Sequence, residues 1–279
     1  MNSNSCCGFL AVAAAVLWAA PGLAIEPAKI LNDPTLRPWA ATVWVGGKQE
    51  CSASLIDPHW VLTARHCVPS YCGKQGPVVS AAVEIRVPDR PPFPAQAVRC
   101  PNVQGGGVVA NDVALILLQY VKDVDDKLPA LSQISLTKLP AATAGPASPM
   151  IAVGWADGNA TRDAAYALGL MLFPREKCQA LLSNKNTCLE KLPLGPNQFC
   201  AWAPKPPESF YGLQRGDSGG SLVRKTTTRP RVMGVASAAC SSGLAIYEDV
   251  FHYQKWIVTQ ACDFYTSPQN RAHCRQRLQ

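Results

Sequence analysis

The chain has 279 residues, of which 48% are hydrophobic and 16% are charged, and its formal net charge is +7 at pH 7. This length is enough for one large hydrophobic core or two small ones, and the composition excludes an intrinsically disordered chain. The positive charge is modest for the length, so it does not indicate a protein that binds nucleic acid.

The N-terminal segment has the composition of a secretory signal. Residues 1–24 carry no charged side chain, and residues 8–20 form an unbroken apolar run. The run is too short to span a bilayer, and the small residues Gly22 and Ala24 lie where signal peptidase commonly cuts. We therefore predict a signal peptide over residues 1–24 and a secreted protein, extracellular or periplasmic, that leaves the membrane after cleavage. The segment lacks the usual basic residues at its start, which keeps a retained anchor as the alternative.

Short β-branched and aromatic runs follow, separated by Gly, Pro, Asn and Asp, and they predict an all-β protein. The first half would contain strands at residues 42–45, 54–56, 60–63, 81–87, 95–98 and 113–118. The second half would contain strands at residues 150–153, 167–173, 221–224, 231–236 and 244–247. Prolines punctuate the stretch at residues 129–149, which we predict to be a linker between the halves. Short strands at regular spacing are typical of antiparallel barrels.

Three of these segments carry side chains suited to nucleophilic catalysis. His66 lies in the run VLTARHC at residues 61–67, Asp112 in NDVALILL at residues 111–118, and Ser218 in GDSGG at residues 216–220. A serine hydroxyl is a weak nucleophile unless a base activates it and a third group orients that base. A carboxylate at the mouth of an apolar strand is costly unless it is paired. The glycines around Ser218 would let the backbone approach a substrate closely.

A helix is predicted after the last strand. Five residues recur there at helical spacing: Val250, Tyr253, Trp256, Ile257 and Gln260. The acids Glu248 and Asp249 precede them and suit a helix start. We expect this helix to pack its aromatic face on the second half of the chain.

The tail at residues 262–279 contains the one basic cluster of the chain. Its members are Arg271, Arg275 and Arg277. We interpret this cluster as a solvated end and not as a contact for nucleic acid or an anionic surface.

Cysteine usage indicates an oxidising compartment. Cys6 and Cys7 would leave with the signal peptide, and ten cysteines would remain. An even number in a secreted chain predicts disulfides. The spacings that hold zinc, Cys-x-x-Cys and His-x-x-x-His, do not accompany them, so we expect no metal and no cofactor.

The three catalytic motifs occur in the order His, Asp, Ser, at intervals of 46 and 106 residues. With these motifs the chain resembles the chymotrypsin-like serine proteases from about residue 38 to residue 257. The resemblance implies a serine endopeptidase that works through an acyl-enzyme. Ser218 would attack the peptide carbonyl, His66 would transfer the proton, and Asp112 would hold the imidazole. The backbone N–H groups of Gly216 and Ser218 would form the oxyanion hole.

The same resemblance implies two packed antiparallel six-stranded β-barrels with a C-terminal α-helix, and a catalytic cleft between the barrels. The protease domain would cover residues 25–261, with a first barrel at about 30–128, a linker at about 129–149 and a second barrel at about 150–261. Protein or peptide substrates are expected, together with protein inhibitors, and the protein is expected to be a monomer. A catalytically silent binding module with the same fold is the alternative.

Two disulfides are implied by the resemblance: Cys51 with Cys67, and Cys178 with Cys200. The family usually has a cysteine four residues before the nucleophile, where this chain has Gln214. That change leaves Cys240 without its usual partner. Six cysteines allow fifteen pairings. We prefer Cys188 for Cys240, because the family's loops at these positions flank one pocket, and Cys72 with Cys100 and Cys262 with Cys274 are then left to pair.

By resemblance, the carboxylate of Asp217 would pair with an N-terminal amine exposed by processing. Two amines are candidates, since the family's usual N-terminal motif is missing. Ile30 would be released by cutting after Lys29, which predicts a zymogen. Ile25 would be released by signal peptidase, which predicts an enzyme that is active from the start.

The resemblance places Gly212 at the floor of the primary specificity pocket, with Leu213 beside it and no carboxylate to meet Arg or Lys. The pocket would also contain Ser237, Ala239 and Ala245. The added methyl groups would narrow it, so we predict cleavage after small or medium apolar residues. Attraction of an acidic substrate group by Arg215 is the alternative.

Overall fold

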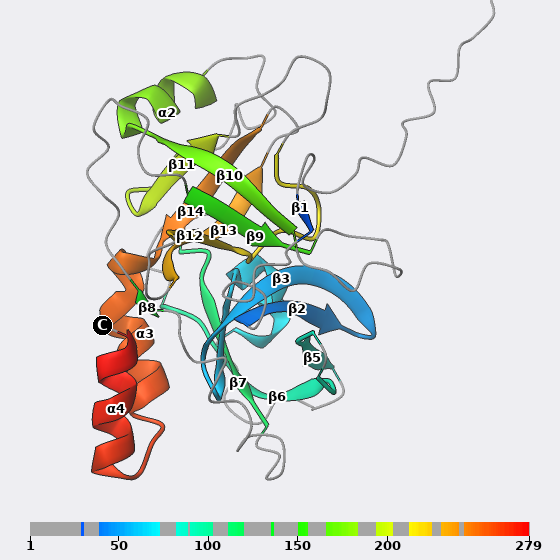
Figure 1. Cartoon of the computed structure of the whole chain (residues 1–279), viewed down its shortest axis with the longest axis vertical. Coiled ribbons are helices and arrows are strands. Elements are labelled where there is room, and N and C mark those ends of the chain that lie inside the picture. The colour runs from blue at the N-terminus through cyan, green and yellow to red at the C-terminus, as the bar shows by residue number, and fades with distance from the viewer. Residues whose placement is uncertain are drawn as a thin grey trace, which may run out of the picture.

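Two closed six-stranded antiparallel β-barrels, one from each half of the chain, form the body of the protein (Figure 1). The expected all-β fold with two barrels is therefore confirmed. The computed structural model describes residues 29–30, 39–72, 82–88, 90–102, 111–119, 135–136, 150–155, 166–183, 194–202, 212–224, 230–239 and 243–278.

The first barrel is the lower, blue to green one in Figure 1. Its strands are β2 (Ala40–Val45), β3 (Lys48–Asp57), β4 (Trp60–Thr63), β5 (Val83–Arg86), β6 (Phe93–Arg99) and β7 (Ala114–Leu118). They close in the order β2-β3-β4-β7-β6-β5. All five residues of β7 and all four of β4 are buried, because these apolar runs have packed neighbours on both faces. These two strands carry the segments from which His66 and Asp112 emerge.

The second barrel is the upper one in Figure 1. Its strands are β9 (Met150–Gly154), β10 (Tyr166–Phe173), β11 (Gln198–Trp202), β12 (Ser221–Arg224), β13 (Arg231–Ala239) and β14 (Leu244–Asp249). They follow the order β10-β11-β14-β13-β12-β9, and pairing of β9 with β10 closes the barrel. Two short strands are added at its edges: β1 (Lys29–Ile30) pairs with β10, and β8 (Ser135–Leu136) pairs with β13. Strand β11 was not predicted from the sequence.

Three α-helices complete the described fold: α2 (Arg175–Leu182), α3 (Val250–Cys262) and α4 (Pro268–Leu278). Among the described residues, none of these helices is long and apolar enough to cross a membrane. The predicted helix corresponds to α3, and Asp249 caps it by accepting a hydrogen bond from the amide of Phe251 (3.0 Å). Its buried residues join one apolar cluster with the first barrel and β13, so α3 packs on both barrels. Glu248, expected at the helix start, instead lies fully buried at the end of β14.

Four disulfides are present in the described part of the chain: Cys51–Cys67, Cys72–Cys100, Cys178–Cys200 and Cys262–Cys274. The structure thus joins these eight cysteines in the same pairs that we expected. The remaining expected pair, Cys188 with Cys240, lies outside the described residues.

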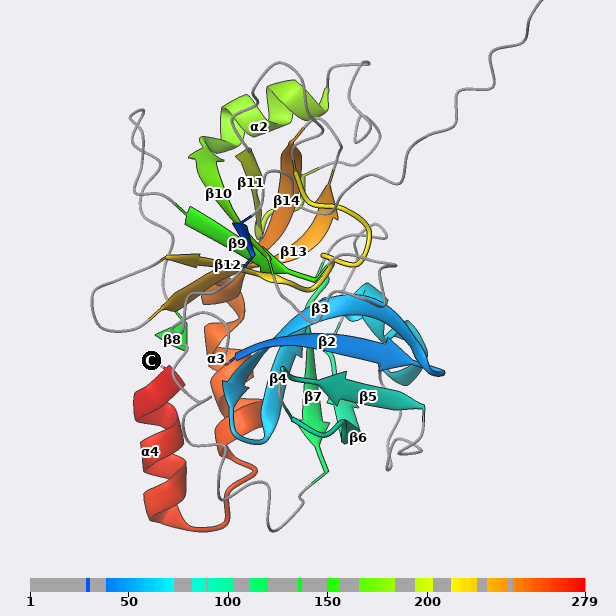
Figure 2. The same ribbon diagram turned by 45° about the vertical axis from the view of Figure 1, so that its right-hand side comes forward.

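The C-terminal tail is not the solvated end that its composition indicated. It forms α4, which lies beside α3 in both ribbon views and is joined to it by Cys262–Cys274 (Figure 2). The Arg277 side chain is only 17% exposed and donates to the buried carboxylate of Asp57 in β3 (2.7 Å). The interpretation of this arginine as solvated was therefore wrong.

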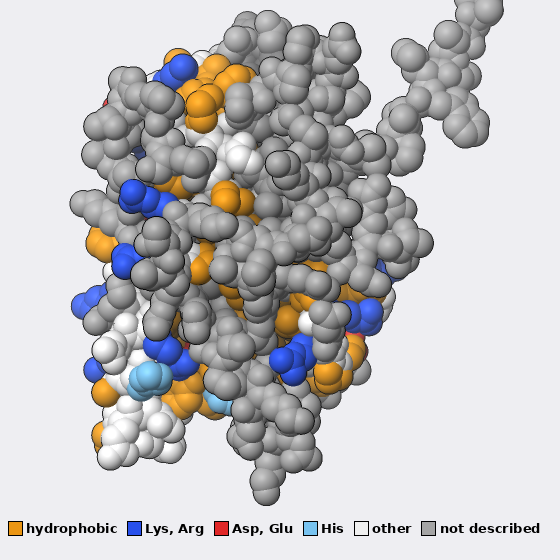
Figure 3. Space-filling view, viewed as in Figure 1, with side chains coloured by type: hydrophobic (Ala, Val, Ile, Leu, Met, Phe, Trp, Pro, Cys, Tyr) orange, Lys and Arg blue, Asp and Glu red, His pale blue; other side chains and the backbone are white. Residues whose placement is uncertain are grey.

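The basic side chains are scattered on the face seen in Figure 3. The described Lys and Arg residues, drawn in blue, lie in several separate places on this face. Among the described residues, this face therefore carries no continuous basic surface.

Replacing Arg277 by methionine is expected to lower the free energy of unfolding by about 3–5 kcal/mol, because it leaves Asp57 buried without its cation. Asp57 is 1% exposed and also accepts from the Tyr265 hydroxyl (2.5 Å). The control is Arg275→Met, whose ion pair with Asp263 is about half exposed and worth under about 1 kcal/mol. Thermal melting compares the variants. Equal midpoints for the two variants would contradict the proposed contribution of α4 to stability.

Candidate active site

The register between β4 and β7 brings His66 and Asp112 together. Thr63 at the end of β4 pairs with Ala114 at the start of β7. His66 follows three residues after Thr63, in a 3-10 turn over Arg65–Cys67, and Asp112 precedes Ala114 by two residues. Because the strands are antiparallel, both residues leave the barrel at the same end.

Asp112 contacts His66 through both the backbone and the ring. Its Oδ1 accepts from the His66 amide (2.8 Å), and its Oδ2 lies 2.7 Å from Nδ1. The carboxylate is almost fully buried, whereas 41% of the His66 side chain is exposed. An ionised carboxylate accepts the proton of Nδ1, so the lone pair of the imidazole is left on Nε2, away from Asp112. The pair therefore presents a base to the surface.

The second barrel supplies a further donor to Asp112. The Ser237 hydroxyl, on β13, donates to Asp112 Oδ2 at 2.6 Å. From the sequence, Ser237 was expected only to bind substrate. Its contact with Asp112 links the two barrels at the site.

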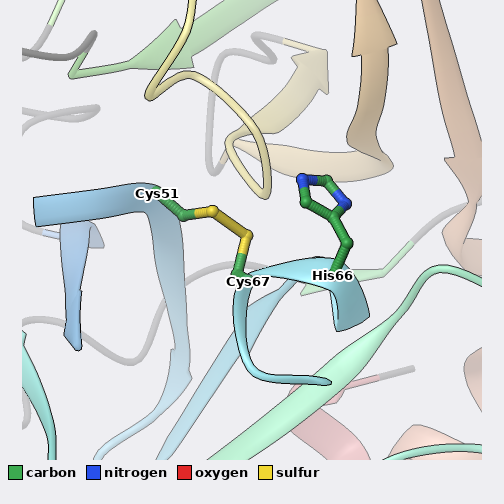
Figure 4. A group of neighbouring side chains, drawn as sticks. All are labelled: Cys51, His66 and Cys67. Atoms are coloured by element: carbon green, nitrogen blue, oxygen red, sulfur yellow. A yellow bond between two sulfur atoms is a disulfide. The ribbon is translucent and has the colours of Figure 1, made fainter. Parts of the chain in front are cut away.

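Ser218 lies in a tight turn held against the first barrel. Its carbonyl oxygen accepts from the Ser52 amide on β3 (2.8 Å) and lies 3.9 Å from Cys67 Sγ, in the residue after His66. Gly219 has a φ of +79°, and a side-chain carbon there would overlap Thr63 Oγ1. A glycine is therefore required for this close approach. Figure 4 shows the His66 ring and the Cys51–Cys67 disulfide facing the yellow loop that leads into β12.

The amides of this turn divide into two groups. Asp217, Gly219 and Gly220 donate their backbone N–H groups to Gln214, Ala236 and Asp217 carbonyls respectively. The amides of Gly216 and Ser218 make no hydrogen bond to any described residue. Gly216 is buried, and a buried N–H without a partner is uncommon. Two unpaired donors, two residues apart, are the arrangement that binds an oxyanion.

Ser52 fixes this turn from the opposite barrel and was missed in the sequence. Its hydroxyl donates to the Gly216 carbonyl (2.8 Å) and accepts from the Trp155 amide (2.9 Å). Both partners are far away along the chain, so no local pattern signals the role.

The variant Ser52→Ala is expected to lower kcat about tenfold, because the Gly216 carbonyl loses its donor and the turn is less well positioned. It should also reduce stability by about 1–3 kcal/mol, since the Trp155 amide loses its acceptor. The matched control is Ser54→Ala, two residues along β3. The Ser54 hydroxyl also bonds across the barrels, to Ser221 Oγ (2.6 Å), but not to the turn. Equal kcat values for both variants would exclude a positioning role for Ser52.

Asp217 is buried (1% exposed) beneath the same turn. Its Oδ2 accepts from the Gln214 amide (2.8 Å), and a side-chain carbon at Gly154 would overlap Oδ1. The carboxylate also acts on Tyr247, whose pKa is raised mainly by burial and further by the charge of Asp217. Asp217 therefore lies between the turn and the end of β9.

A cavity of about 310 Å³ opens beside Ser218. Its lining residues are Leu213, Gln214, Arg215, Ser218, Ala236, Ser237, Ala238 and Ala239. Of the five residues expected to bind substrate, Leu213, Ser237 and Ala239 line it. Gly212 and Ala245 do not belong to its described lining: Ala245 is buried in β14, where it pairs with Ala239. The described walls of the cavity carry no carboxylate.

The side chains of Cys51, His66 and Cys67 cluster closely enough to suggest a metal site (Figure 4). The two sulfurs are joined in a disulfide, however, and metal ligation by cysteine requires thiolates. This donor set does not fit a metal ion.

Comparison with known proteins agrees with this geometry. The family model described as Trypsin matches residues 32–257. Kallikrein 1-related peptidase b26 of Mus musculus is 25% identical over 239 residues, covering 79% of this chain and 84% of the relative. Bradykinin-releasing enzyme KR-E-1 of Gloydius ussuriensis is 25% identical over 217 residues, and thrombin-like enzyme acutin of Deinagkistrodon acutus is 26% identical over 215 residues. Each of these two alignments covers 74% of this chain and 83% of the relative.

Proposed function

The chain belongs to the trypsin family of serine proteases and is a serine endopeptidase, and from this premise we propose that Ser218, His66 and Asp112 are its catalytic residues. The supporting observation is the hydrogen-bonded pair of His66 and Asp112 in one barrel, facing a turn from the other barrel that carries Ser218 and two amides without a hydrogen bond to any described residue. The substrates are proteins or peptides.

In the proposed reaction, His66 Nε2 accepts the proton of the Ser218 hydroxyl as Oγ attacks the peptide carbonyl. The tetrahedral intermediate then expels the amine, which takes that proton from His66, and an acyl-enzyme remains. Water attacks the acyl-enzyme with the same proton transfers in reverse, which releases the acid and restores Ser218. Asp112 stabilises the imidazolium that forms twice in this cycle.

The amides of Gly216 and Ser218 would bind the oxyanion in both halves of the reaction. Each such donor is worth about 3 kcal/mol of activation free energy. Ser52 acts through the Gly216 carbonyl, so it is a positioning residue.

We propose that the cavity beside Ser218 is the primary specificity pocket and that it accepts small or medium apolar side chains. Three alanines line it, and the charged residue in its described lining is Arg215, a cation that repels Arg and Lys side chains. Digestion of a diverse peptide library tests this assignment. We expect cuts mainly after residues of the size of alanine to leucine. Preferred cleavage after Arg or Lys would contradict it.

Asp217 is proposed to receive the N-terminal amine of the processed chain, and we favour Ile25 over Ile30. Lys29 and Ile30 form β1, which pairs with β10 next to Gly154, the residue against the Asp217 carboxylate. Cutting after Lys29 would divide this two-residue strand, whereas cutting before Ile25 leaves it intact. N-terminal sequencing of the active secreted form should find Ile25, and a start at Ile30 would contradict the proposal.

Secretion, removal of residues 1–24 and a monomeric enzyme without membrane attachment remain parts of the proposal. Four disulfides in the described residues support an oxidising location. The mass of the protein found in the culture medium tests secretion and the removal of residues 1–24. The mass of the purified enzyme in solution tests whether it is a monomer.

A further inference from the structure

Glu248 is a fully buried carboxylate directly behind Asp112. It lies at the end of β14, in the second barrel, and is 0% exposed. Its Oε1 accepts from the backbone amide of Asp112 (3.1 Å) and from Gln198 Nε2 (2.7 Å). Its Oε2 accepts from the hydroxyl of Tyr253 on α3 (2.7 Å). The proposed reaction uses none of these atoms, so this buried acid needs another explanation.

The contact falls on a backbone turn that must be held. Asn111, just before Asp112, has a φ of +58°, the left-handed region that non-glycine residues adopt infrequently. The Tyr253 hydroxyl also lies 3.0 Å from Asn111 Oδ1. Glu248 and Tyr253 therefore contact both residues of the turn, one through the main chain and the other through the side chain.

Asp112 is thus held from two sides. In the first barrel, His66 donates to the Asp112 carboxylate. In the second barrel, Ser237 donates to the same carboxylate, and Glu248 accepts from the Asp112 backbone amide. Small displacements of a catalytic group reduce the rate steeply, so groups that fix the Asp112 backbone matter for catalysis.

We propose that Glu248, together with Tyr253, is a positioning residue that fixes the Asn111–Asp112 turn by hydrogen bonding and so sets the geometry of the His66–Asp112 pair. This inference rests on the proposed catalytic function. Neither residue touches the substrate, and both act through Asp112.

The surroundings of Glu248 favour a hydrogen-bonding role over a charge role. Burial raises the pKa of Glu248, hydrogen bonds from Tyr253, Gln198 and the Asp112 amide lower it, and the charge of Asp112 raises it. No Lys, Arg or His among the described residues forms an ion pair with it. The pKa of Tyr253 is itself raised, mainly by burial and then by Glu248. A neutral amide can therefore replace the acid.

The variants Glu248→Gln and Glu248→Ala separate these roles. In Glu248→Gln, the amide oxygen can accept from Asp112 and Gln198, while its NH₂ donates to the Tyr253 hydroxyl, whose proton turns to Asn111. We expect Glu248→Gln to keep kcat within about threefold of the wild type, and Glu248→Ala to lower kcat at least about tenfold with KM within about twofold. An unchanged kcat in Glu248→Ala, or equal losses in both variants, would overturn the inference.

Two further variants complete the experiment. Tyr253→Phe removes one contact with the turn and should lower kcat at least about fivefold at unchanged KM, which keeps the test decisive should Glu248→Ala not fold. Glu84→Ala is the control, since Glu84 lies on β5 and pairs with Arg86 at the surface (3.2 Å). Absence of peptide hydrolysis by processed wild-type protein would overturn the proposed function and this inference together. Active wild type with normal kcat in Glu248→Ala and Tyr253→Phe would overturn the inference alone.

Discussion

Replacing Ser218 by alanine is expected to lower kcat by about 10⁶-fold, while the protein stays folded. The variant loses the oxygen that forms the acyl-enzyme, and neither His66 nor the amides of Gly216 and Ser218 can replace it. KM should change little, because the walls of the adjoining cavity keep their side chains. The loss is measured as steady-state peptide hydrolysis by enzyme whose N-terminus has been verified.

The control for this variant is Ser221→Ala, three residues further along the chain. Ser221 lies on β12, and its hydroxyl bonds only to Ser54 among the described residues (2.6 Å). Its removal should reduce stability and leave kcat within about threefold of the wild type. Equal hydrolysis by wild type and Ser218→Ala would refute the assignment of the nucleophile.

The second large effect is expected for Asp112→Asn, at about 10⁴-fold in kcat. Replacement of the triad aspartate by asparagine causes a loss of this size in a serine protease of the same family. The physical reason can be followed in the contacts of Asp112. Asparagine has one oxygen, which can still accept from the His66 amide, and its NH₂ then faces Nδ1. The imidazole must then carry its proton on Nε2 instead of Nδ1. A protonated Nε2 has no lone pair, so it can no longer accept the proton of Ser218.

Steady-state kinetics and melting of Asp112→Asn distinguish this tautomer effect from misfolding. Asp263→Asn serves as the matched control, because the Asp263 side chain is about half exposed and pairs with Arg275 at the surface. Activity in Asp112→Asn within tenfold of the control would show that the carboxylate does not orient the base.

Much of the barrel fold was predictable because its strands carry local signals. β4, β7 and β9 are short apolar runs bounded by turn residues, and each was predicted within one residue of its observed bounds. β11 was missed because its five residues, QFCAW, show no alternation; four of them are buried. α2 was missed because it begins after Pro174 with no side-chain cap.

The tail shows why composition alone misled us. Helix α4 has a mostly polar sequence, and only Cys274 and Leu278 are buried. Besides its contacts with nearby residues, it has one with a residue far away along the chain: Arg277 bonds to Asp57, 220 positions earlier. No local pattern reports a partner at that separation.

In the candidate site, the catalytic motifs were predictable from the sequence, but the residues that hold them in place were not. The His66, Asp112 and Ser218 motifs are local and occur in a recognised order. Their supports are not local: Ser52 contacts Gly216 over 164 residues, and Glu248 contacts Asp112 over 136. Glu248 and Asp249 were both interpreted as helix-start acids because they precede the residues at helical spacing. In the fold, Asp249 caps α3, whereas the Glu248 side chain is buried.

Mapping a fluorophosphonate adduct by mass spectrometry tests the catalytic assignment most directly. The reagent labels a serine only where a base activates it and an oxyanion site receives the phosphoryl oxygen. Processed wild-type protein should carry one adduct, on the peptide that contains Ser218, and the adduct should be lost in Ser218→Ala. Correctly processed protein that takes up no label, or that is labelled on another serine, would contradict the account.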